Sequence, residues 1–391
     1  MIVSTTEVMR DSANMEESLV EWRRRLHMYP ELSGNEVQTS EYIVSELRKM
    51  GVDASVVNER HAVVGIIKGR GTENIGVRCL RADMDALPIR EANDVPYKSR
   101  SDGVMHACGH DAHVAIQLGA AALLNKYKDR FAGEIRLLFE PAEETVGGAL
   151  ELVNAGYMKG ANAVFGLHMQ PDLSAGQVEA RVGAMSGYSD NLKFNVRGKS
   201  AHGAYPERGT DAIVAASNLV LALQTIVSRN ASPFESAALS IGIMEGGTAG
   251  NIICGNVYMK GTLRTLSAET RELALRRINE IARGVGAAYG CECEAEVTAG
   301  YEAVICDERF VSALRGISSQ MNAEYFTKEY PSLGVDSFGC LTAAAPGLYY
   351  NLGCGKTAGA LPLHTDAFDI DEKCLAIGAC LQTLLCFTNP L

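Results

Sequence analysis

The sequence lacks the features of several large classes of protein. No run of lysine and arginine is longer than residues 23–25, and the net charge of −11 opposes the basic face that nucleic-acid binding requires. No apolar stretch reaches the ~20 residues that a bilayer-crossing helix needs. The N-terminus has no basic start followed by an apolar stretch, which argues against a signal peptide. From these absences we expect a cytoplasmic protein with no nucleic-acid or membrane partner.

Cysteine is present, but not in the arrangement of a disulfide framework. The 11 cysteines are an odd number in a long chain, and only Cys291 and Cys293 lie close together. Such scattered cysteines are typical of free thiols that are buried in a protein from a reducing compartment. We therefore expect buried thiols rather than disulfides.

The length of 391 residues, of which 47% are hydrophobic, favours two domains with substantial cores. The first part of the chain alternates short β-type runs with helical periodicity. This alternation indicates an α/β layered domain around a largely parallel sheet. The predicted strands include residues 62–67, 75–80, 133–140 and 163–168, and the predicted helices include residues 35–51 and 113–127.

The pattern changes at residue 188 and changes back near residue 300. Between these points the predicted elements follow the order β-α-β-β-α-β, which is the ferredoxin-like arrangement. The sequence therefore predicts one discontinuous domain, residues 1–185 plus 300–391, with a compact domain of residues 186–299 inserted in it. The predicted elements of the insertion are strands 188–197, 236–245, 255–265 and 291–299 and helices 209–228 and 267–287.

Histidine is scarce, yet three of the eight histidines fall within residues 104–116. Cys108 and His110 lie two residues apart, so their side chains would diverge on a helix but can converge in a loop. Gly109 between them adds backbone freedom. Imidazole and thiolate at short spacing favour a transition-metal site. Packing against apolar neighbours is an equally good explanation of this segment by itself.

Three further segments offer donor side chains at the ends of predicted elements. The strand that ends in L-L-F-E-P-A-E-E delivers Glu143 and Glu144, whose charges conflict in one pocket unless a cation or a proton intervenes. If one of the two glutamates is a metal ligand and the other a general base, a cation and a proton resolve the conflict. A solvated acidic turn is the plainer alternative. His168 ends another strand, at the edge where the active sites of α/β sheets lie, and His364 precedes the last predicted helix.

Together these segments supply enough donors for two close metal ions, with positions left for water and substrate. A thiolate and several imidazoles favour zinc, cobalt or nickel over magnesium or calcium. The candidate ligands are Cys108, His110, Glu144, His168 and His364.

Seven motifs follow one another along the chain: R-R-R-L-H-M-Y-P-E-L-S, R-A-D-M-D-A-L-P-I, H-A-C-G-H-D-A-H, E-P-A-E-E, G-L-H, A-H-G-A-Y-P-E-R-G-T-D-A-I and L-H-T-D-A-F. In these motifs and their order the sequence resembles the aminoacylase, hippurate-hydrolase and auxin-conjugate-hydrolase family of di-metal amidohydrolases, which are relatives of glutamate carboxypeptidase. The resemblance spans essentially the whole chain. It implies a zinc-peptidase-like catalytic domain, with the inserted domain as a lid that also forms the contact of a homodimer.

The resemblance also implies roles for individual residues. It assigns the five candidate ligands to two divalent ions per subunit, with manganese as a further candidate beside zinc, and it assigns Glu143 to the general base. His202 matches a lid histidine that in the family reaches the active site of the neighbouring subunit. Asn251 and Arg264 match lid positions near the carboxylate of the substrate. Asp83 matches a segment beside the metals, as does Asp85, and we expect both to orient ligands.

The sequence departs from the family pattern at a few positions. Glu140 stands where glutamine is common, and Asp366 stands where proline is usual. Asp336 and Ser337 stand where a Glu-Asp-Phe triplet is frequent, which changes the charge of that loop. These departures remove neither a candidate ligand nor the candidate base.

These observations predict an enzyme that hydrolyses the amide bond of N-acyl-L-amino acids, such as N-acetyl or N-benzoyl conjugates. A dipeptidase or carboxypeptidase that uses the same metals is the alternative that the sequence leaves open. A non-catalytic binding protein with the same fold would predict losses among the ligands or at Glu143, and the sequence shows none.

Overall fold

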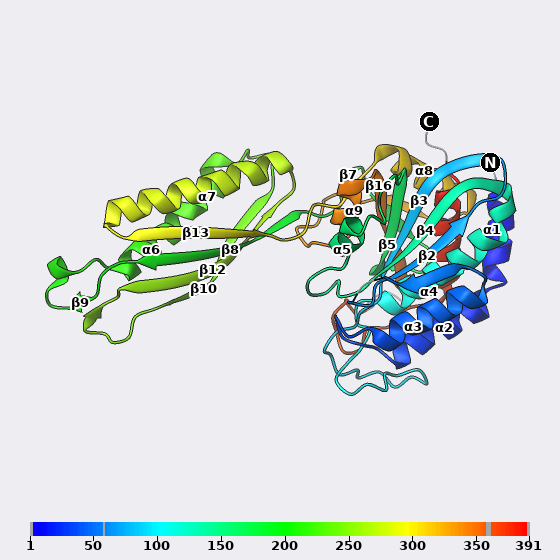
Figure 1. The fold of residues 1–391 in the computed structure, drawn as a ribbon, viewed down its shortest axis with the longest axis horizontal. Coiled ribbons are helices and arrows are strands. Elements are labelled where there is room, and N and C mark those ends of the chain that lie inside the picture. The colour runs from blue at the N-terminus through cyan, green and yellow to red at the C-terminus, as the bar shows by residue number, and fades with distance from the viewer. Residues whose placement is uncertain (1–2, 58, 357–360, 389–391) are drawn as a thin grey trace. The chain divides into compact units, whose positions relative to one another are not determined.

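The structure is a computed structural model that describes residues 3–57, 59–356 and 361–388. The chain divides into two compact units (Figure 1), of which the first comprises Met1–Met185, Val304–Tyr330 and Ser337–Leu391 and the second Ser186–Ala303 and Pro331–Asp336. The sequence analysis placed everything after residue 299 in the first domain. Residues 300–303 and Pro331–Asp336 instead pack with the second unit.

The first unit is built on a mixed sheet with a parallel centre. Its ten strands in the described part of the chain follow the main order β1-β2-β4-β3-β5-β16-β14-β7. β4, β3, β5 and β16 run parallel to one another, whereas β2 pairs antiparallel with both β1 and β4. All of β16 is buried, as expected for a strand covered on both faces. The strands are β1 (Asp53–Val56), β2 (Val63–Lys68), β3 (Glu73–Asp83), β4 (Phe131–Glu140), β5 (Ala163–Ser174), β6 (Val178–Ala180), β7 (Gly183–Ala184), β14 (Ile305–Cys306), β15 (Tyr325–Thr327) and β16 (Gly347–Gly355).

Two apolar helices, α4 and α10, pack against each other and against β3 and β5. Almost every residue of both is buried, so neither has a polar face. The 11 cysteines are all free and buried, which confirms the predicted thiols. The sequence analysis missed α1, a short helix of low apolar content whose N-terminus is capped by the Ser4 side chain. The helices are α1 (Thr5–Ala13), α2 (Glu16–Met28), α3 (Val37–Lys49), α4 (His110–Lys126), α5 (Ala149–Asn154), α8 (Glu308–Gln320), α9 (Gly339–Ala344) and α10 (Lys373–Cys386).

The second unit has the predicted ferredoxin-like arrangement. Its four-stranded antiparallel sheet has the order β10-β12-β8-β13, and the buried faces of α6 and α7 pack with it in a separate core. The inserted elements are therefore predicted correctly within a few residues. Strands β9 and β11 were not predicted, and they form a small two-stranded sheet of their own. The elements are β8 (Tyr188–Arg197), β9 (Ala201–His202), α6 (Ala212–Thr225), β10 (Ala237–Gly246), β11 (Ile252–Ile253), β12 (Asn256–Thr265), α7 (Ala268–Tyr289) and β13 (Glu292–Ala299).

Helix α6 is the one helix in the described part of the chain that bears on the expected absence of a membrane-crossing segment. With the turn that follows it, the helical segment Ala212–Asn230 spans 19 residues and is long and apolar enough to cross a membrane by length and composition alone. Leu219 and Leu223 on one face of α6 are buried in the unit's own core, whereas Leu221 is 69% exposed. The inner face of α6 therefore contributes to the core of the second unit, whereas its outer apolar face is exposed to solvent.

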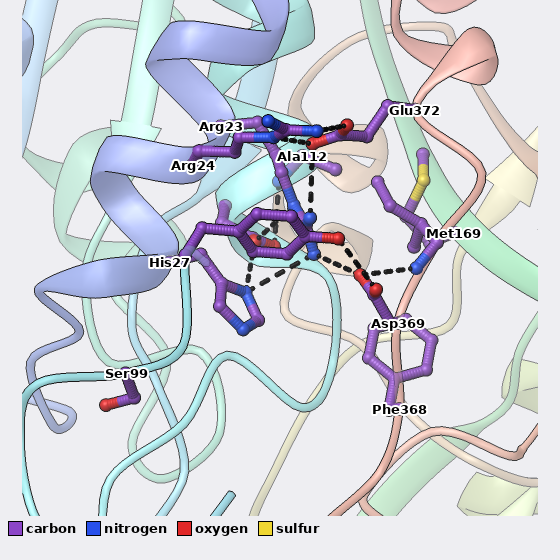
Figure 2. Close-up of polar contacts among 12 residues, drawn as sticks. Arg23, Arg24, His27, Ser99, Ala112, Met169, Phe368, Asp369 and Glu372 are labelled. Carbon is purple, nitrogen blue, oxygen red and sulfur yellow. Dashed lines mark hydrogen bonds and ion pairs between the residues drawn. The ribbon is translucent and has the colours of Figure 1, made fainter. Parts of the chain in front are cut away.

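A buried arginine joins α2 to the starts of α4 and α10. Arg23 is fully buried, and its guanidinium lies 2.9 Å from Asp111 and 2.9 Å from Asp369 (Figure 2). It also lies 3.3 Å from Glu372, which Arg24 contacts from a side chain that is 42% exposed. A desolvated guanidinium is stable only when carboxylates replace its lost hydration. The ion pairs of Arg23 therefore hold three distant segments of the chain together.

Replacing Arg23→Met should lower the free energy of unfolding by about 3–5 kcal/mol, because Asp111 stays buried without its arginine. Arg24→Met, one residue along the helix, should cost less than about 1 kcal/mol because its side chain is partly solvated. The fluorescence of Trp22, the chain's one tryptophan, reports on α2 during urea unfolding. Equal losses in the two variants would contradict the role of the buried ion pairs.

Candidate metal centre

The five predicted ligands of the first unit come from four places around one edge of the sheet. Cys108 and His110 lie at the N-terminus of α4, and Glu144 follows the end of β4. His168 lies within β5, and His364 lies in the segment that precedes α10. Since β4 and β5 both run parallel to β3, their carboxyl ends are directed to the same edge.

The backbone at Gly109 lets Cys108 and His110 converge. Gly109 has φ 87°, in the left-handed region that favours glycine, and α4 begins at the next residue rather than at the predicted residue 113. A Cβ at this position would lie 2.8 Å from Cγ of Met169. Cys108 therefore lies in the loop, and His110 is the first residue of the helix. This arrangement allows the two side chains to converge.

The donor atoms form two groups that share one thiol. Sγ of Cys108 lies 3.5 Å from Nε2 of His168 and 3.3 Å from Nε2 of His364. Oε1 of Glu144 lies 3.2 Å from Nε2 of His364 and 3.8 Å from Nε2 of His110. Cys108, His110 and His168 can converge on one ion, and Cys108, Glu144 and His364 on a second, since the donor atoms within each group lie within 4.8 Å of one another. The structure thus brings all five predicted ligands together.

Neighbouring groups orient the imidazoles towards this space. Nδ1 of His110 lies 3.1 Å from Oδ1 of Asp85, whose other oxygen accepts the backbone N–H of Glu144. Nδ1 of His168 is 2.9 Å from the carbonyl oxygen of Met169. Nε2 of His110 is buried and forms no hydrogen bond with any residue that the structure describes. A buried nitrogen without a hydrogen bond, directed at a carboxylate, fits a metal ligand.

The electrostatics of the cluster also fit a cation. Burial raises the pKa of the Cys108 thiol. Burial lowers the pKa of His110, but the charges of Asp83 and Cys108 and the hydrogen bond to Asp85 together outweigh it and hold this pKa well above its ordinary value. A divalent ion bound here would reverse both effects, because a coordinating thiol loses its proton. Glu143, the candidate base, shares a further group of donors with His110 and Glu144.

A fourth group of donors is a hydrogen-bonded chain rather than a ligand set. Nδ1 of His113 lies 2.6 Å from Oδ1 of Asp83, and Nε2 of His113 accepts the backbone N–H of Met169. Both nitrogens are therefore occupied. Arg81, which the sequence analysis missed, pairs with Asp83 at 2.6 Å. Its sequence signal is its position as the first residue of the motif R-A-D-M-D-A-L-P-I, two residues before Asp83.

The three predicted substrate contacts lie in the second unit and do not form one cluster there. His202 on β9 pairs with Ile252 on β11, and the carbonyl of Asn251 accepts the N–H of Gly203 at 2.7 Å, so His202 and Asn251 are neighbours. Arg264 lies near the other end of β12, eight residues beyond Asn256. At ~3.3 Å per residue, roughly 25 Å of strand separates these two ends.

The fold and the donor set together define the class of the protein, a metal-dependent amidohydrolase. Residues 79–386 match Peptidase family M20/M25/M40, and the chain belongs to this family. It is 37% identical over 363 residues to N-acetyl-L-cysteine deacetylase of Bacillus subtilis, covering 93% of this chain and 86% of the relative. It is 37% identical over 385 residues to thermostable carboxypeptidase 1 of Saccharolobus solfataricus, covering 97% of each.

A solved structure supports the same family. It is described as a dinuclear metal-binding peptidase of the M20 family from Bacillus subtilis, and it matches with a TM-score of 0.84 at 31% identity. The match covers 96% of this chain and 98% of that structure. The fold predicted from the sequence is therefore confirmed.

Glu36 supports the turn that presents the two adjacent glutamates. It is fully buried before α3, and its Oε1 accepts the backbone N–H of Ala142 at 2.7 Å. Ala142 has φ 56°, so the turn into Glu143 and Glu144 has a left-handed backbone that needs such support. Burial raises the pKa of Glu36 to about 7.

Glu36→Gln should therefore stabilise the protein only at higher pH. The raised pKa means that the folded state binds the proton more tightly than the unfolded state, so stability falls as pH rises from about 4.5 to 7. The free energy of unfolding of the variant should exceed that of the parent by little at pH 4.5 and by up to about 3 kcal/mol at pH 8. Urea unfolding at both pH values measures this. Glu41→Gln, on the exposed face of α3, serves as the control, and a gain in stability that does not depend on pH would contradict the assignment.

Proposed function

We propose that this protein hydrolyses the amide bond of N-acyl-L-amino acids and releases a carboxylic acid and a free amino acid. The observation that carries the proposal is the convergence of Cys108, His110, Glu144, His168 and His364 beside Glu143. The 37% identity to a Bacillus subtilis protein named N-acetyl-L-cysteine deacetylase supports this substrate class.

Two divalent ions would be held by these five ligands, and Cys108 belongs to both of the donor groups that could hold them. The thiolate and imidazoles favour zinc, cobalt or nickel, and the carboxylate of Glu144 also suits manganese. Bound ions would supply Lewis-acid chemistry, because they polarise an amide carbonyl and lower the pKa of water.

The side chains of the protein would move the protons and hold the substrate. Glu143 accepts a proton from the attacking water and then donates it to the leaving amine. Its Oε1 accepts the N–H of Ser337 at 3.4 Å, which orients the carboxylate. In this proposal His202 stabilises the developing oxyanion, and Arg264 with Asn251 binds the carboxylate of the amino acid.

The separation within the second unit supports a homodimer. His202 and Asn251 lie at one end of β12 and Arg264 near the other, so one rigid unit cannot place all three on one small substrate. A second subunit that supplies His202 together with its neighbour Asn251 resolves this separation. The exposed apolar face of α6, which includes Leu221, and the edge strand β10 offer a surface for that contact.

A comparison of substrates and metal content tests the proposed reaction. The metal-loaded protein should release free amino acids from N-acetyl or N-benzoyl amino acids faster than from dipeptides, and a chelator should abolish the release. Glu143→Gln should keep its metal but lower kcat by about 100- to 10,000-fold. The adjacent Glu144→Gln is the matched control and should instead lose metal. Full activity of Glu143→Gln would refute the assigned base.

Mixed subunits test the homodimer and the role of His202. His202→Ala and Glu143→Gln should each be nearly inactive alone. If His202 acts on the neighbouring subunit, an exchanged mixture should regain about a quarter of the parental activity, because each mixed dimer has one complete site. No recovery in a mixture that mass spectrometry shows to have exchanged would contradict this arrangement.

A carboxypeptidase or dipeptidase remains a second candidate. The observation that favours it is the 37% identity to a protein named thermostable carboxypeptidase 1, which covers 97% of each chain. Both reactions cleave an amide next to a free carboxylate, so they need the same metals and the same Glu143. Faster hydrolysis of dipeptides in the comparison above would favour this candidate, and metal binding without any hydrolysis would favour a binding protein.

A further inference from the structure

Arg81 is the centre of a buried ion-pair cluster at the carboxyl edge of the sheet. Its side chain is 1% exposed on β3, and its Nη1 lies 2.6 Å from Oδ2 of Asp83. Its Nε lies 2.6 Å from Oε2 of Glu140, the last residue of β4. Its Nη2 donates to Oγ of Ser337 at 2.9 Å. One guanidinium therefore fixes the ends of two strands and the loop before α9.

This cluster leads directly to the candidate base. Ser337 is fully buried, and its backbone N–H donates to Oε1 of Glu143 at 3.4 Å. The hydroxyl of the same residue is held by Arg81. On the other side, Oε1 of Glu140 accepts the N–H of Ala149 at 2.7 Å, which fixes the end of β4 three residues before Glu143. Both routes from Arg81 converge on the segment that carries the base.

The number of carboxylates around Arg81 is constrained by burial. Asp83 and Glu140 are two negatively charged partners of this buried guanidinium, whereas its partner Ser337 is neutral. A carboxylate at position 337 would add a buried negative charge, which is costly unless a charge nearby is removed. Glu140 and Ser337 are also two of the positions at which this sequence departs from the motifs that it resembles. The structure shows that these two departures face the same guanidinium.

We propose that Arg81 is a positioning residue for Glu143. It acts through Ser337, and Glu140 provides the counter-charge that keeps the guanidinium in place. Residues 140 and 337 form one electrostatic unit, because a charge at either position faces the same guanidinium. The catalytic part of this inference rests on the proposed function, whereas the coupling between the two positions does not.

A double-mutant cycle on positions 140 and 337 tests the coupling. Glu140→Gln removes a charge from the cluster and Ser337→Asp adds one, so each should lower the melting temperature of the metal-free protein. The double variant E140Q/S337D restores the number of charges and should recover much of the loss. We expect its kcat to exceed the value calculated from the two single effects by about tenfold or more. A decrease in the melting temperature of the double variant that equals the sum of the two single decreases would overturn the coupling.

Ser337→Ala tests the positioning role, because it removes the contact to Arg81 without changing any charge. It should lower kcat several-fold while KM and the metal content stay at the parental values. An unchanged kcat would overturn the role of Arg81 in positioning Glu143. If the parent hydrolysed no N-acyl amino acid or peptide, the proposed function would fall, and the melting temperatures of the cycle would still decide the coupling.

Discussion

Buried charge must be neutralised, and this requirement connects most features of the catalytic unit. The ends of β3 and β4 and the starts of α4 and α10 carry carboxylates and imidazoles with little access to water. Arg23 neutralises the group that includes Asp111 and Asp369, and Arg81 neutralises the group that includes Asp83 and Glu140. The remaining acidic and thiol donors form the candidate metal centre, where divalent ions would supply the missing positive charge.

The two arginines give the candidate metal centre a rigid frame. Arg23 ties α2 to residues next to His110 and to the segment that follows His364, while Arg81 ties β3 to the segments around Glu143. A metal site with several ligands from distant segments needs such support, because small displacements of a ligand or a base are costly for activity. The apolar helices α4 and α10 complete the frame by packing against the sheet.

Much of this could be predicted from the sequence because its local signals are strong. The alternation of β-type and helical runs predicted both units, and the order β-α-β-β-α-β predicted the second. The parallel sheet was correct only at its centre, because the antiparallel edge strands β1 and β2 are too short for pairing direction to be predicted. Helix α1 was missed because its 9 residues are too few for a reliable periodicity signal, and it packs against α10.

The sequence by itself determined which side chains are available for metal chemistry. Cys108, His110, Glu144, His168 and His364 are recognisable by residue type, by position at the ends of elements and by motif. Only the tertiary structure decided how they are held. Arg23 and Arg81 begin two of the quoted motifs and Glu36 lies in none, but the sequence does not show what any of them contacts, because an ion pair or hydrogen bond between residues far apart in the chain leaves no periodic trace. Burial turns these ordinary polar residues into the support of the site, and burial is a property of the folded chain.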